Sequence, residues 1–375
     1  MVGIKPKSER NYGIDLLRII SMLMVVTLHT LSRSGLITQS QLLSPRYEFS
    51  WLLELASYCA VDCFVIISGY VGLNSKFRIS RIIQLWVQVV FYLVIAELIL
   101  QFVNMSNGAA FDINSLINQF LPISNSTYWF FTQYFALSLL MPFINKALKN
   151  CRYSSYIALS LVLLILFSLI PCLITSPLPY IGTKFKADLF FTNRGYSILW
   201  FIVLYILGCS FKRLREENKL NIKPIFSLMA YTISVLILWA LKYYCDSSKP
   251  RLSANFAVSY TGVFVVTSAI SLVILFENLK IGKTASKIIK FIVPNVFAVY
   301  LVNDCPQIYE AYVKRTLPLL NTSALKTVVF LFIIIVGFFI ISVSFDKLRA
   351  LIFEVLKINK LIKKIDNTHI NTFFN

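Results

Sequence analysis

The first long apolar segment of this chain contains two side chains suited to chemistry, Arg18 and His29, and the only other histidine is His369. Histidine suits proton transfer, because its unperturbed pKa lies near physiological pH. An arginine within a lipid-spanning helix is costly and usually faces a protein or water-filled interior. Eleven helical steps return to within roughly 20° of the same face and advance by about 16 Å. The spacing therefore predicts that Arg18 and His29 face one interior from two depths.

The carboxylates Asp15, Asp62 and Glu97 also fall in apolar segments. Asp15 precedes Arg18 by three residues, so we expect the two to pair on one helix face. Asp62 needs a buried partner, for which Arg18 is one candidate, and a structural role is favoured over a catalytic one. Glu97 fits either a proton relay or a pairing residue, and the sequence does not decide between them.

The composition indicates what kind of element positions these residues. Of the 375 residues, 57% are hydrophobic and 14% are charged, which is typical of a polytopic membrane protein rather than a large soluble core. The net charge of +19 is better explained by basic loops facing an anionic membrane leaflet than by nucleic-acid binding. The seven cysteines form no metal-binding pattern, so no metal site is predicted. A disulfide among Cys172, Cys245 and Cys305 is the minor alternative to free thiols.

Ten apolar stretches are long enough to cross a bilayer, which takes about 17–25 residues. We therefore predict an all-α fold, a polytopic transmembrane helical bundle of about ten helices. Residues 1–346 are expected to form the transmembrane domain, and residues 347–375 a cytosolic, amphipathic basic tail. The stretches lie near 13–33, 50–72, 80–103, 128–146, 155–175, 196–212, 224–244, 256–277, 287–304 and 325–346.

The distribution of basic residues predicts the orientation of this bundle. With the N-terminus inside, the cytosolic segments hold 24 of the 36 Lys and Arg residues and the outer connections hold 10. This asymmetry follows the positive-inside rule, so both termini are expected to be cytosolic. The first segment lacks a small-residue cleavage pattern, which favours a retained first helix over a signal peptide.

Four motifs occur in order along the first 145 residues. They are GIDLLRIISMLMVVTLH from Gly13, VDCFVIISGY from Val61, FRISRIIQLW from Phe77, and YWFFTQYFALSLLMPF from Tyr128. Together they resemble the membrane acyltransferase family 3, whose members modify surface polysaccharides and other envelope molecules. In that family an arginine, ten residues and a histidine mark the first helix, and Arg18 and His29 match this pattern.

Two further family patterns are matched, and one is not. Ser68, Gly69 and Tyr70 match the Ser-Gly-aromatic ending of the second helix, and Arg78 and Arg81 match the paired arginines before the third. Relatives often end a late helix in histidine, where this chain has Asn303. The departure puts a catalytic duty of that position in doubt and leaves His29 as the single intramembrane base.

The resemblance implies an O-acetyltransferase in the cell membrane that transfers an acyl group from acetyl-CoA to a hydroxyl of a cell-surface or lipid-linked polysaccharide. Arginine forks suit phosphate oxygens, so Arg78 and Arg81 are expected to bind the CoA phosphates. The donor arm would then pass Arg18, and His29 would act as general base on the acceptor hydroxyl. Acetyl is preferred as the family's commonest donor group, and other short acyl groups and the oligomeric state stay open.

Several of these residues have other interpretations. Without the resemblance, Arg78 and Arg81 would be ordinary topology anchors. Ser68 with Gly69 is favoured as a site of close helix packing over a carrier of an acyl intermediate.

Trp129 and Tyr134 are aromatic residues at the start of an apolar stretch, and they are expected in the interfacial aromatic belt.

An alternative function is a transporter or flippase of a glycan precursor, with a charge relay through Arg18, Asp62 and Glu97. The absence of an internal repeat counts against a transporter.

Overall fold

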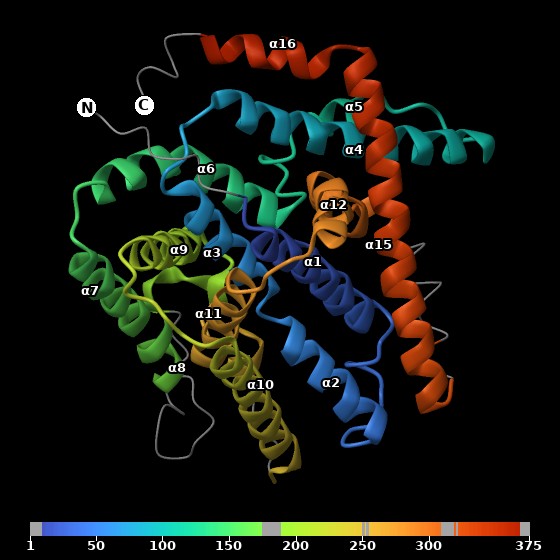
Figure 1. Ribbon diagram of the computed structural model, residues 1–375. Helices are drawn as coiled ribbons and strands as arrows, with labels where there is room; N and C mark the ends of the chain where they lie inside the picture. Colours follow the sequence, from blue (N-terminus) through green and yellow to red (C-terminus); the bar gives the residue numbers. More distant parts are fainter. Residues whose placement is uncertain are drawn as a thin grey trace.

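The computed structural model describes residues 10–174, 189–249, 252, 255–308, 319 and 322–367, which are helical with short connections and contain no strand. The chain folds into a bundle in which helices far apart in sequence lie side by side (Figure 1). The α-helices are α1 (Tyr12–Arg33), α2 (Pro45–Ser57), α3 (Ala60–Gly72), α4 (Ile79–Ser106), α5 (Ile113–Asn118), α6 (Trp129–Leu148), α7 (Tyr153–Leu164), α8 (Ile170–Ile174), α9 (Ile198–Glu216), α10 (Pro224–Ser247), α11 (Val263–Glu277), α12 (Lys283–Ile292), α13 (Val296–Asn303), α15 (Ala324–Val355) and α16 (Ile358–Lys364).

The prediction of a polytopic helical bundle is confirmed. Each of the ten apolar stretches has a helix or a helix pair as its counterpart. Among the described residues, seven helices are long and apolar enough to cross a membrane. An eighth span results if α9 and the short helical segment Leu189–Gly195 before it, which meet at a bend of 78°, are taken together. The apolar helix α11 is shorter, and α6 carries Gln133 and Asn145 among its apolar residues.

Polar contacts join the helix ends that are predicted to be cytosolic. Asn11, at the start of α1, donates to the carbonyl oxygen of Glu277 at the end of α11. The Glu277 carboxylate accepts from Tyr70 at the end of α3 and from Arg215 near the end of α9. Because these ends are joined, α1 runs opposite to α3, α9 and α11, as the predicted alternation requires.

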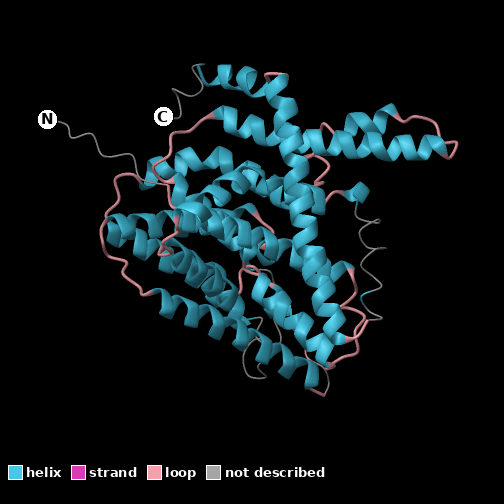
Figure 2. Cartoon of the chain, turned by 45° about the vertical axis from the view of Figure 1, so that its right-hand side comes forward, coloured by secondary structure: helices cyan, strands magenta, loops and turns pink. Residues whose placement is uncertain are grey.

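The opposite ends of the helices are joined in the same way. Arg33 at the end of α1 pairs with Asp304 after α13, and Tyr47 near the start of α2 donates to Asp246 near the end of α10. Gln307 donates to Glu97 in the later part of α4. Beyond Glu97, α4 and the short α5 project from the rest of the bundle (Figure 2).

The helices α3 and α9 approach each other most closely where each carries a glycine. A Cβ atom added at Gly69 would collide with the carbonyl oxygen of Tyr205, and one at Gly208 would collide with that of Ile66. Small residues allow such close backbone approach between membrane helices. Gly69 therefore has the packing role predicted for it, and α3 is held against α9 by backbone contact.

The last long helix continues past the predicted boundary of the membrane domain. α15 runs without a break from Ala324 to Val355, and Arg349 pairs with the buried Asp346 inside it. Asp346 also accepts from Tyr92 of α4 at 2.9 Å, which fixes α15 to α4. The division into residues 1–346 and 347–375 stays a prediction. All seven cysteines are free thiols, so the alternative of a disulfide is wrong.

Candidate functional site

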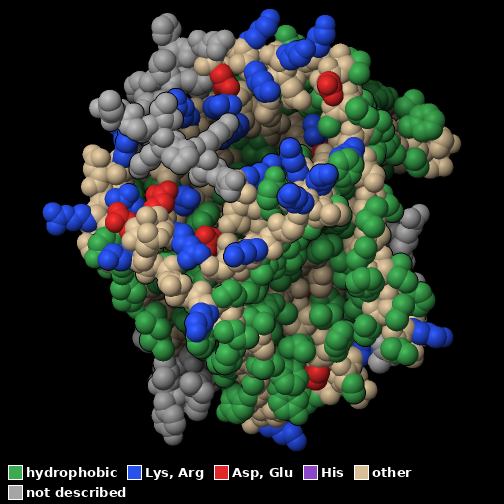
Figure 3. Space-filling model, viewed as in Figure 1, with side chains coloured by type: hydrophobic (Ala, Val, Ile, Leu, Met, Phe, Trp, Pro, Cys, Tyr) green, Lys and Arg blue, Asp and Glu red, His purple; other side chains and the backbone are tan. Residues whose placement is uncertain are grey.

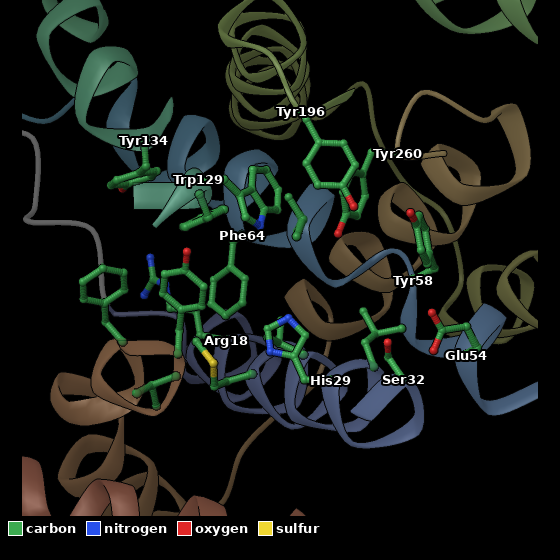
Figure 4. A pocket seen from close by; sticks show the side chains of 18 of the residues that line it. Arg18, His29, Ser32, Glu54, Tyr58, Phe64, Trp129, Tyr134, Tyr196 and Tyr260 are labelled. Carbon is green, nitrogen blue, oxygen red and sulfur yellow. The ribbon is translucent and has the colours of Figure 1, made fainter. Parts of the chain in front are cut away.

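A cavity of about 600 Å³ lies inside the bundle, between α1, α2, α3, α6 and α13 (Figure 4). Its floor is one face of α1, which is lined by residues at helical spacing: Arg18, Met22, Val25, Leu28, His29 and Ser32. The N-cap Asn11 begins α1 by accepting hydrogen bonds from the backbone N–H groups of Gly13 and Ile14. Arg18 and His29 thus line the same cavity.

Arg18 is held at one end of this cavity by an ion pair. Its guanidinium donates to the Asp15 carboxylate at 2.5 Å, and Arg10 donates to the other oxygen of the same carboxylate. Asp15 is buried, while the Arg18 side chain keeps about a quarter of its surface exposed. The predicted pairing of Asp15 with Arg18 is therefore present, and it fixes the rotamer of an arginine that still reaches the cavity.

His29 lies further along the same face and contacts Asn303. Its Nδ1 atom is within hydrogen-bond distance of Asn303 Oδ1, at the end of α13. Arg33, one turn after His29, donates to the backbone carbonyl and to the side-chain oxygen of Asn303 and pairs with Asp304 at 3.0 Å. Asn303 is thus held from two sides.

This arrangement determines which imidazole nitrogen can accept a proton. A guanidinium has no acceptor, so the Asn303 atom that Arg33 contacts is the amide oxygen. His29 must then donate from Nδ1 to that oxygen. In a neutral imidazole the other nitrogen, Nε2, is the acceptor. His29 therefore has the tautomer that a general base facing the cavity requires.

Ser68 and Gly69 are adjacent in sequence but have separate surroundings. Gly69 packs against α9, whereas Ser68 lines the cavity. The Ser68 hydroxyl lies 3.1 Å from the Tyr134 hydroxyl and donates to the carbonyl oxygen of Phe64 in its own helix. The packing role expected for the pair belongs to Gly69 alone.

Asp62 and Glu97 have partners other than Arg18, and neither lines the cavity. Asp62 is fully buried and accepts from the Trp200 indole at 3.2 Å, so Arg18 is not the partner that was considered for it. Glu97 accepts from Gln101, Ser115 and Gln307. Among the described residues these contacts do not connect Arg18, Asp62 and Glu97 into the relay that a transporter would use.

The cavity wall opposite α1 is aromatic. Trp129 and Tyr134 of α6 belong to it and face the cavity, while their place in the interfacial belt stays a prediction. Their apolar neighbours suit either location, and the sequence alone could not separate the two. Trp129 stacks on Tyr260 with ring centroids 5.8 Å apart, and Tyr260 stacks on Tyr58 at 4.8 Å. Tyr196 contacts both Trp129 and Tyr260.

Glu54 of α2 also lines the cavity, and it was not among the residues predicted from the sequence. Its side chain lies beside Tyr58 and Ser32, at the end of the cavity away from Arg18 (Figure 4). A signal was available, because an ionisable residue within an apolar span is a functional candidate by default. Asn303 was noticed only as a departure from the family pattern, and its contact with His29 depends on the tertiary fold.

Arg78 and Arg81 lie outside the cavity, at the exposed start of α4. One turn after Arg81, Leu85 lines the cavity, so the two arginines lie close in sequence to a cavity-lining residue. Ser80 between the two arginines donates from its backbone N–H and its hydroxyl to Asp366, which follows α16. On the face in view, Lys and Arg gather over the upper part of the molecule and hydrophobic side chains cover much of the lower part (Figure 3).

No group of His, Cys, Asp and Glu residues in the described part of the chain has an arrangement that could hold a metal ion. Comparison with known protein families gives one match, to an acyltransferase domain over residues 11–347. Curated proteins and solved structures give no match. The matched range contains every helix that lines the cavity.

Proposed function

The chain belongs to the acyltransferase 3 family, and we propose that it transfers an acetyl group from acetyl-CoA to a hydroxyl of a cell-surface or lipid-linked polysaccharide at the cell membrane. The observation that carries this proposal is the position of His29 within the cavity, with Asn303 on its Nδ1. A general base must reach the proton that it removes and must present an unprotonated nitrogen to it.

The reaction proceeds in one transfer. His29 Nε2 takes the proton of the acceptor hydroxyl while its oxygen attacks the thioester carbonyl. The new C–O bond forms, the C–S bond breaks, and the imidazolium returns the proton to the departing CoA thiolate. Ser68 also lines the cavity, but its hydroxyl is engaged with Phe64 and Tyr134, which favours direct transfer over a serine-bound acyl intermediate.

The donor reaches His29 from the start of α4. The exposed Arg78 and Arg81 bind the CoA phosphates, because guanidinium groups pair with phosphate oxygens. The arm of the donor passes Leu85 and Arg18, both of which line the cavity. Arg18 keeps its charge balanced by Asp15 and offers its remaining donors to the polar atoms of the arm.

The test is the substitution His29→Ala in the full-length protein. We expect acetylation of the envelope glycan, and CoA release by the purified protein, to fall by about 10²–10⁴-fold, the usual contribution of a positioned base. Membrane insertion is checked by blotting. The matched control is His369→Ala, which changes the only other histidine of the chain. Unchanged acetylation in His29→Ala would refute the mechanism.

A further inference from the structure

The end of the cavity away from Arg18 contains a carboxylate that nothing in the described protein pairs with. Glu54 is 7% exposed, and its Oε2 atom is buried without a hydrogen-bond partner. The side chain lies over the cavity beside Tyr58 and Ser32 (Figure 4). A buried carboxyl group without hydrogen bonds is costly. Its retention inside a cavity therefore points to a ligand that supplies hydrogen-bond donors.

The wall beside Glu54 is built of stacked aromatic rings. Tyr58, Tyr260 and Trp129 form a continuous stack, and Tyr196 packs against the last two. The Tyr58 hydroxyl is fixed by donating to the Val258 carbonyl at 2.9 Å. Ligand sites typically combine such apolar and aromatic walls with a few placed polar groups. The wall suits the C–H face of a ring-shaped ligand whose edge carries hydroxyls.

Among the described lining residues, no cation lies at this end of the cavity. Glu54 is the one carboxyl side chain that lines it, and the one arginine, Arg18, lies at the other end (Figure 4). An anionic ligand beside Glu54 would be buried without a cation to balance its charge, which is costly. A neutral ligand would instead form hydrogen bonds between its hydroxyls and the Glu54 carboxyl group.

We propose that Glu54 and the wall formed by Tyr58, Trp129, Tyr196 and Tyr260 are the acceptor subsite, and that this subsite selects an uncharged, hydroxyl-bearing sugar over an anionic one. The sugar ring packs against the aromatic wall while its hydroxyls form hydrogen bonds with the Glu54 carboxyl group. The inference rests on the proposed function, because it places the acceptor next to His29.

The test measures sugar binding without turnover. Trp51 and Trp129 line the cavity, so a bound sugar changes the tryptophan fluorescence of the purified full-length protein. The probes are methyl glucoside and methyl glucuronide, which share one ring and differ by a carboxylate. We expect saturable binding of the glucoside and at least tenfold weaker binding of the glucuronide. Glu54→Leu should weaken glucoside binding about tenfold, because it removes the hydrogen bonds to the sugar hydroxyls.

Two further variants make the result decisive. Glu54→Gln keeps a hydrogen-bond donor and an acceptor at the same place and should retain most of the glucoside binding, so this variant tests the proposal if Glu54→Leu fails to fold. The matched control is Glu48→Gln, on the same helix but outside the cavity lining, which should bind as the wild type does. Absence of glucoside binding, equal binding of both sugars, or unchanged glucoside binding in Glu54→Leu would overturn the proposal. His29→Ala separates the two claims, because retained sugar binding with full turnover would refute the base and leave this subsite standing.

Discussion

At the level of single residues, the contact between His29 and Asn303 decides which imidazole nitrogen is available as a base. An acceptor on Nδ1 keeps the proton there and leaves Nε2 unprotonated. A carboxylate in the same place would do this as well, whereas an aliphatic side chain would leave the tautomer undetermined. Asn303 is therefore a positioning residue in this proposal, acting through His29 rather than on the substrate.

Substitution of Asn303 tests this role. We expect Asn303→Ala to lower kcat by roughly tenfold to a hundredfold, a part of what a positioned base supplies, with little change in KM for acetyl-CoA. Asn303→Asp should retain most of the activity, because the carboxylate also accepts from Nδ1. The measurement is steady-state CoA release. Equal losses in both variants, or a loss confined to KM, would show that Asn303 does not position the base.

The burial of Asp304, the neighbour of Asn303, predicts how the stability of the protein depends on pH. Burial raises the pKa of Asp304 from 3.8 to about 6, although the Arg33 guanidinium opposes this shift. Since the folded-state pKa is the higher one, this group adds stability below about pH 4, and the contribution is lost as the pH rises through about 6. We expect Asp304→Asn to remove this dependence. The measurement is the thermal unfolding temperature between pH 4 and 7, with Asp112→Asn as the control. If the unfolding temperature changes with pH equally in the wild type and in Asp304→Asn, the prediction is contradicted.

The residues on one helix were accessible from the sequence, and those joined by the tertiary fold were not. Arg18, His29 and Asp15 share α1, so helical geometry alone predicts their relation. Asn303 is 274 positions from His29, and no local pattern connects the two. Glu54 carried a usable signal as an intramembrane carboxylate, whereas its missing partner is visible only in the folded protein.

At the level of elements, the α3–α9 contact determines where the cavity wall stands. α3 contributes Val61, Phe64 and Ser68 to the cavity, and its other side is pressed against α9 through Gly69. A small-residue contact was predictable at the Ser68–Gly69 pair, but its partner Gly208 was not, because sequence spacing within one helix carries no information about the facing helix.

Alanine substitutions measure this contact. Gly69→Ala and Gly208→Ala place a methyl group against a backbone carbonyl that cannot move independently, so each should destabilise the protein by about 1–3 kcal/mol. The control is Gly337→Ala in α15, where an added Cβ meets nothing within 4 Å and helix propensity favours alanine by about 1 kcal/mol. Thermal unfolding of detergent-solubilised protein gives the ranking. If all three variants unfold at the wild-type temperature, the close approach of α3 and α9 is wrong.

At the level of the whole molecule, the fold places the basic start of α4 and the proposed acceptor subsite near different ends of one cavity. Arg81 lies one turn before the cavity-lining Leu85, and Glu54 lies at the far end, beyond His29 (Figure 4). Hydropathy and basic-residue counts were enough to predict the bundle and that α1 runs opposite to α3, α9 and α11. They were not enough to place Trp129, since an aromatic residue suits both an interface and a cavity wall.

The double substitution Arg78→Ala with Arg81→Ala tests the donor end. We expect KM for acetyl-CoA to rise by about tenfold or more with a smaller change in kcat, because charge-assisted hydrogen bonds to phosphate would be lost. The matched control removes two exposed lysines from the same predicted side, Lys283→Ala with Lys287→Ala. If both double variants change KM equally, the arginines act only through net charge and are topology anchors.

Asp366 in the tail is expected to affect donor binding, because it lies where the donor phosphates are proposed to bind. Its carboxylate accepts from the backbone N–H and the hydroxyl of Ser80, between the two arginines at the start of α4. A negative charge there competes with phosphate for the positive end of the helix dipole. We therefore expect Asp366→Asn to lower KM for acetyl-CoA, by about twofold to fivefold at low salt for an interaction of roughly 0.3–1 kcal/mol, and the effect should shrink as salt is raised. Asp112→Asn, which removes the capping carboxylate of α5 on the opposite predicted side, should leave KM unchanged. A KM that rises in Asp366→Asn would mean that the tail supports donor binding rather than competing with it.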